Sequence, residues 1–132
     1  WTGVLRSKGF IWLATRNETA GEWSQAGVTC HHGVAGAFWA AVPEEDWEVS
    51  DARREKLKAV WQEPYGDRRQ ELVFIGTGLD REALERRLDA CLLTDEEMAL
   101  GSEGWKSLPD PFPGWEVVSE EEIAAEGADE RA

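Results

Sequence analysis

A six-residue apolar run, ELVFIG at residues 71–76, most constrains how this chain can fold. The run is short, contains β-branched and aromatic residues and ends at glycine, which is typical of a strand. Asp80 follows as a helix N-cap, and Leu79 and Leu84 stand at the two positions of a hydrophobic staple. The pattern therefore predicts a strand over 71–76 and a helix over 81–92, with Cys91 as a core thiol on the inner stripe of the helix.

Three apolar segments in the first third of the chain predict further strands, and a polar turn between the first two favours a hairpin. These segments cover residues 9–15, 22–28 and 37–42. Gly33–Gly36 is expected to interrupt the chain before the third strand. Pro43 should end that strand, because proline cannot donate a hydrogen bond to a strand ladder.

Capping residues predict two more helices. Ser50 or Asp51 can start one of them, and Thr94 with Glu97 forms the capping box of a shorter one that Gly101 should end. The elements then follow the order β-β-β-α-β-α with a short extra helix. This order predicts an α+β fold, a two-layer sandwich in which a mostly antiparallel sheet carries helices on one face, in a ferredoxin-like or permuted arrangement.

The length of 132 residues fits one domain, which we expect to span residues 1–115. The proline-rich segment 109–113 should lie extended, and the acidic residues 116–132 are expected to form a disordered tail.

The net charge of -13 disfavours binding to nucleic acid or to an anionic membrane. No apolar run reaches the roughly 20 residues of a membrane helix, so a cytoplasmic location is expected; the start at Trp1 indicates an excised fragment.

Motifs for nucleotide binding and hydrolysis are absent from the sequence. There is no GxxxxGK[ST] phosphate loop, no GxSxG and no HExxH, and the glycines at 76 and 78 stop short of a dinucleotide motif. The chain is therefore expected not to be an enzyme and to hold no nucleotide cofactor.

One group of metal-ligating residues stands out, namely Cys30, His31 and His32 in an expected loop. Thiolate and imidazole suit zinc, cobalt or copper, so these residues are the candidate metal site. Adjacent residues of an extended chain point in opposite directions, however, so a closed site needs a turn and a further ligand. The alternative is an exposed loop with an incidental thiol, and weak binding at most is expected.

The tryptophans fall into two predicted groups. Trp12, Trp39 and Trp61 lie in predicted elements and are expected in the core. Four others stand at edges or in loops, where tryptophan often marks an interface; they are Trp23, Trp47, Trp105 and Trp115.

Several segments together resemble the C-terminal domain of CobW-type GTPases. These are RSKGFIWLA at 6–14, EWSQAG at 22–27, GDRRQELVFIG at 66–76 and LDACLLT at 88–94. The resemblance implies a domain that follows a P-loop G domain in proteins thought to couple GTP hydrolysis to metal delivery. It also implies that the GTP and magnesium site and the CxCC metal motif belong to that absent G domain, and that nothing catalytic carries over to this chain.

With this resemblance, the chain is expected to contact the G domain or a client metalloprotein. The expected interface residues are Arg6, Lys8, Trp23, Gln25, Arg68, Arg69 and Glu71. For the cations, the alternative is protection of edge strands and surface ion pairs. Two other functions stay open at this point, a free-standing small ligand-binding or enzymatic domain and a purely structural module that regulates the parent GTPase.

Overall fold

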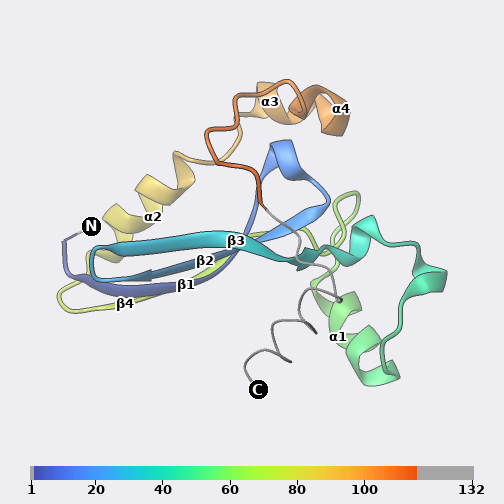
Figure 1. Ribbon diagram of the computed structural model, residues 1–132, viewed down its shortest axis with the longest axis horizontal. Helices are drawn as coiled ribbons and strands as arrows, with labels where there is room; N and C mark the ends of the chain where they lie inside the picture. Colours follow the sequence, from blue (N-terminus) through green and yellow to red (C-terminus); the bar gives the residue numbers. More distant parts are fainter. Residues whose placement is uncertain (1, 116–132) are drawn as a thin grey trace, which may run out of the picture.

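The fold is built on one four-stranded sheet in a computed structural model that describes residues 2–115. Its strands are β1 Val4–Trp12, β2 Thr19–Ala26, β3 Thr29–Ala37 and β4 Glu71–Gly76. They lie in the order β3-β2-β1-β4, and every neighbouring pair is antiparallel (Figure 1). Three consecutive strands with the fourth returning beside the first have the strand order of a Greek key. The predicted α+β class with an antiparallel sheet is confirmed. The acidic tail predicted for 116–132 lies outside the described residues.

Three of the helices described in residues 2–115 begin at the capping residues that the sequence predicts, whereas α4 was not predicted and has no side-chain cap. The helices of residues 2–115 are α1 Asp51–Val60, α2 Arg81–Asp89, α3 Asp95–Ala99 and α4 Gly101–Trp105. Ser50 caps α1 by accepting a hydrogen bond from the Arg53 amide, Asp80 caps α2, and Thr94 completes a capping box at α3. Within the same residues, no helix combines the length and apolar character that crossing a membrane requires.

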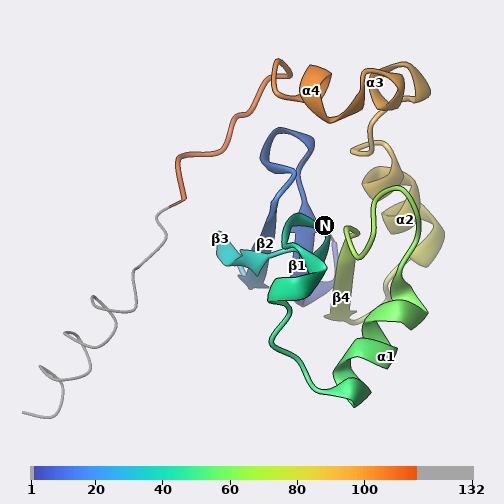
Figure 2. The same cartoon turned by 90° about the vertical axis from the view of Figure 1, so that its right-hand side faces the viewer.

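Three short 3₁₀ turns complete the described elements, η1 Ala14–Arg16, η2 Trp39–Ala41 and η3 Glu44–Asp46. The helix α2 lies along one face of the sheet, and α1 lies toward the other end of the strands (Figure 1). The short helices α3 and α4 form a cap above η1, at the end of the β1–β2 hairpin (Figure 2).

The third strand lies earlier in the chain than predicted. Residues 29–37 form β3, so Gly33–Gly36 does not interrupt the chain, and 37–42 is not a strand. The reason is the turn between β2 and β3. Gly27, with a φ of 58°, forms this turn, so the chain re-enters the sheet only two residues later, at Thr29. The expected strand is replaced by η2 because the Asp67 carboxylate, and not a neighbouring strand, accepts the amides of Trp39 and Ala40. The Cys30–His32 segment consequently lies in a strand and not in a loop.

Two predictions about burial are wrong. Trp105, predicted at an edge, is only 2% exposed and packs edge-on against Trp12 at 5.9 Å, while Tyr65 lies 6.2 Å from it. Cys91, predicted in the core, is exposed, and its thiol donates to the Arg87 carbonyl. The prediction assumed that Cys91 lies on the inner face of a helix. The helix α2 ends at Asp89, however, so Cys91 follows the helix and its thiol is not directed by the helical repeat.

Candidate functional site

On the face of the sheet opposite α2 lies a surface whose apolar residues are exposed among the described residues 2–115. Arg6 stands directly opposite Ile75, and Lys8 stands opposite Val73, so these four side chains share one face. A bulge in β1 between Val4 and Arg6 adds Leu5 to the same face. Leu5 is 58% exposed, Val73 62% and Ile75 58%. We call Leu5, Arg6, Lys8, Val73 and Ile75 the open face.

The two cations of the open face have no partner within the part of the chain that the structure describes. The ion pairs found among residues 2–115 involve other basic residues, and neither Arg6 nor Lys8 makes a side-chain hydrogen bond there. Both residues are exposed. An apolar surface with unpaired cations at its side is the arrangement expected where another surface docks.

Trp23 and Gln25, predicted at the interface, lie on the other face of the sheet. The Ser7 hydroxyl donates to Gln25 Oε1 at 2.8 Å and accepts from Trp23 Nε1 at 2.9 Å, while Gln25 Nε2 donates to the Gly27 carbonyl. Ser7 and Gln25 are buried. Their polar groups are therefore satisfied inside the domain, and this network positions β1 against β2.

Arg68 and Arg69 are bound within the domain as well. Arg68 donates to the Asn17 carbonyl at 2.7 Å, which ties the segment before β4 to the β1–β2 connection. Arg69 pairs with Glu71 at 3.2 Å, and its guanidinium lies 5.1 Å from the centre of the Phe10 ring. Of the seven predicted interface residues, Arg6 and Lys8 are thus the cations whose side chains make neither a hydrogen bond nor an ion pair within residues 2–115.

The structure separates the three candidate metal ligands along β3. Cys30 pairs with Gln25, His31 with Ser24 and His32 with Trp23, so His31 points to the opposite face from the other two. Within residues 2–115, no three Cys, His, Asp or Glu side chains are grouped so that they could hold a metal ion.

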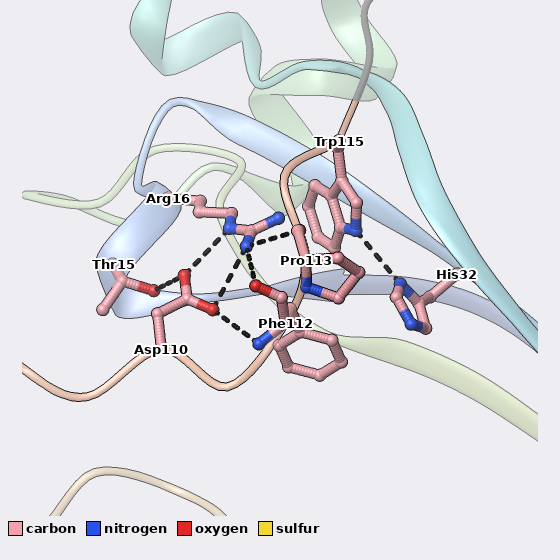
Figure 3. A network of polar contacts seen from close by, with 7 residues as sticks. All are labelled: Thr15, Arg16, His32, Asp110, Phe112, Pro113 and Trp115. Atoms are coloured by element: carbon pink, nitrogen blue, oxygen red, sulfur yellow. Dashed lines mark hydrogen bonds and ion pairs between the residues drawn. The ribbon is translucent and has the colours of Figure 1, made fainter.

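His32 already has a hydrogen-bond partner. Its Nδ1 accepts from Trp115 Nε1 at 3.0 Å, and its ring lies edge-on to Phe112 at 5.0 Å (Figure 3). A neutral imidazole has only one unprotonated ring nitrogen, so a metal ion would have to displace Trp115 to use it. The donor types suit zinc or cobalt, but the geometry provides no preformed site.

A second cluster joins the end of the β1–β2 hairpin to residues 109–115, which we call the C-terminal strap. Arg16 makes two hydrogen bonds to the Asp110 carboxylate, at 2.9 and 3.1 Å, and two more to the carbonyls of Phe112 and Pro113 (Figure 3). Its guanidinium also lies 4.3 Å from the centre of the Trp115 ring. Residues 109–113 have no regular structure, as predicted, but the contact with Arg16 could not be predicted because 94 residues separate Arg16 from Asp110.

Hydrogen bonding favours the ionised form of the Asp110 carboxyl group in the strap. The Thr15 hydroxyl donates to Asp110 at 2.6 Å, and this bond, followed by those from Arg16, lowers the pKa of Asp110 from its usual value. A carboxyl group with a lowered pKa stabilises the fold above its unfolded pKa of about 4 and loses that contribution only as the pH falls through the folded value. The strap is therefore held in place at neutral pH.

An open cavity of about 560 Å³ lies between the sheet and the α3–α4 cap. Its lining is mainly apolar and includes Trp12, Met98, Trp105 and Phe112. Cys91 is also among the lining residues, together with the carboxylate residues Glu97 and Asp110, and no histidine of residues 2–115 lines the cavity. The cavity therefore offers a mainly apolar contact surface.

Comparison with known proteins gives one family match and several relatives. The family model described as "Cobalamin synthesis protein cobW C-terminal domain" matches residues 1–92. A zinc-regulated GTPase metalloprotein activator of Dictyostelium discoideum is 43% identical over 111 residues, covering 83% of this chain and 23% of that protein. The zinc chaperone Rv0106 of Mycobacterium tuberculosis is 32% identical over 114 residues, covering 86% of this chain and 28% of that protein.

The chain spans about a quarter of the length of these curated relatives. No solved structure matches it. The matched residues 1–92 include the whole sheet and α2, whereas the α3–α4 cap and the strap lie beyond them.

Proposed function

The chain belongs to the CobW C-terminal domain family, and from this membership we propose that it serves as the non-catalytic C-terminal domain of a GTP-dependent metal chaperone. The observation that carries the proposal is the family match over residues 1–92 in a sequence that has no phosphate loop. Nucleotide chemistry then belongs to a separate G domain of the parent protein, together with its magnesium ion. The domain itself is not an enzyme.

The names of both relatives mention zinc, and this supports zinc as the metal of the parent protein. We propose that the parent delivers zinc, or the chemically similar cobalt, to a client metalloprotein in the cytoplasm. Cys30, His31 and His32 contribute weak binding at most, since His31 points away from the other two and His32 is hydrogen-bonded to Trp115. The domain thus supports delivery without storing the ion.

The partners of the domain are the G domain and the client, and neither nucleic acid nor membrane is among them. The net charge of -13 supports this choice, because phosphate backbones and anionic lipids would be repelled. The apolar cavity under the α3–α4 cap is the feature that favours the rival function, a free-standing ligand-binding domain. The family match favours the accessory role.

We expect that removing residues 1–115 from the parent protein leaves its kcat for GTP hydrolysis unchanged within about threefold, which corresponds to less than about 1 kcal/mol in barrier height. The reason is that this chain has no GxxxxGK[ST] phosphate loop to cradle the phosphates of GTP. Steady-state hydrolysis by the full and shortened parents measures the effect, and replacing the phosphate-loop lysine of the G domain is the positive control. A fall of hundredfold or more, the effect of losing a general acid or base, would place a catalytic group in this domain and contradict the proposal.

A further inference from the structure

We propose that the G domain of the parent protein docks on the open face of the sheet. The surface that the G domain presents would be an apolar patch flanked by carboxylates. This inference rests on the proposed function and adds the location and chemistry of the contact. It concerns Leu5, Arg6, Lys8, Val73 and Ile75.

The apolar part of the open face has no cover in the described structure. An antiparallel sheet with one solvated face normally alternates apolar and polar residues, with the polar ones outside. On β4, however, Val73 and Ile75 point to the solvated face, and the bulge in β1 places Leu5 beside them. No described helix lies under this part of the sheet, on the side away from α2 (Figure 1). Adjacent exposed aliphatic side chains on two strands form a patch that a partner surface can bury.

The charges of the open face define the partner. The chain has 27 acidic and 14 basic residues, so a cation has many carboxylates available to it. Arg6 and Lys8 nevertheless have no carboxylate partner within residues 2–115, whereas the nearby Arg69 pairs with Glu71. Electrostatic complementarity therefore favours a partner surface that carries Asp or Glu residues beside an apolar centre.

The path of the chain favours the G domain over a separate client. The amide of Thr77 donates to the Gly3 carbonyl at 3.0 Å, so the start of β1 is held at the end of β4. Because β1 begins at Val4, any segment that leads into β1 reaches the sheet directly beside Leu5. Tethering of this kind raises the effective concentration of the attached domain at the open face, in the millimolar range for short linkers. A separate client has no such advantage.

Zero-length carbodiimide cross-linking of the full parent protein, followed by mass spectrometry, tests the inference. The reagent joins a lysine amine to a carboxylate in contact with it, so Lys8 should be cross-linked to an Asp or Glu of the G domain. Ile75→Asp changes a half-exposed side chain and should reduce this cross-link at least tenfold while the near-ultraviolet circular dichroism of the tryptophans is retained. Lys56 is the matched control, an exposed lysine on α1 whose reactions should not change.

Three outcomes would overturn the docking site. They are a Lys8 cross-link that survives Ile75→Asp, a cross-link only to a second copy of the parent, and no cross-link from Lys8 while Lys56 reacts with the G domain. A parent that binds GTP but gives one of these outcomes contradicts the docking inference alone. A parent with no GTP binding contradicts the proposed function itself, so the two failures are distinguishable.

Discussion

Replacing Trp105 by alanine should lower the free energy of unfolding by about 3–5 kcal/mol, the range for removing a buried aromatic side chain. Trp105 is 2% exposed, packs against Trp12 and Tyr65, and donates from Nε1 to the Glu97 carbonyl at 2.8 Å. The alanine variant leaves a cavity and removes the hydrogen bond that holds α4 to α3. Urea denaturation of both proteins measures the change.

Leu100→Ala is the matched control, because Leu100 lies in the same cap but is 54% exposed. Its effect should stay within about 0.5 kcal/mol, as for most surface substitutions. Equal effects of the two substitutions would mean that the α3–α4 cap is not part of the core. The large effect expected at Trp105 implies that the domain needs residues beyond the family-matched 1–92 to complete its packing.

Asp67→Ala should cost about 2–4 kcal/mol, because it removes two charge-assisted hydrogen bonds and leaves two amides without an acceptor. The Asp67 side chain is buried, and its two oxygens accept from Trp39 and Ala40 at 3.0 and 2.9 Å. Gly66 allows this close approach, since a Cβ at that position would collide with Ala40 and Trp61.

Denaturation and hydrogen exchange at the amides of Trp39 and Ala40 measure the loss at Asp67. Asp67→Asn keeps one carbonyl acceptor in nearly the same volume, so its cost should be about half that of the alanine variant. Amide protection at Trp39 and Ala40 that stayed at the wild-type level in both variants would show that the Asp67 carboxylate does not hold η2 in place.

Elements governed by local signals could be predicted from the sequence. The strand over 71–76 and the caps at Ser50, Asp80 and Thr94 were predicted correctly, because a short apolar run and a capping side chain act over a few residues. The third strand was misplaced for two reasons. Its start depends on the turn at Gly27, and the segment that was predicted as a strand is instead bound by Asp67, which accepts a hydrogen bond from the amide of Ala40, 27 residues earlier in the chain. The burial of Trp105 likewise depends on a contact with Trp12, which is far away in sequence.

The candidate site could be predicted only in part, for the same reason. Arg6 and Lys8 stand out as cations in an acidic chain, and both are exposed in the structure. The face that each strand residue occupies depends on register, however, and a shift of one residue exchanges the two faces. The register opposes Ser7 to Gln25 and so commits Gln25 to the interior. The bulge that brings Leu5 beside Ile75 has no signature in the sequence.

Calorimetric titration of residues 1–132 with Mg-GTP tests most directly the claim that this chain is an accessory domain without a nucleotide site. The missing phosphate loop predicts no saturable heat at GTP concentrations up to about 1 mM, which limits any binding free energy to weaker than about -4 kcal/mol. The full parent should bind under the same conditions. A stoichiometric dissociation constant near 1 μM for the chain alone, about -8 kcal/mol, would contradict the account.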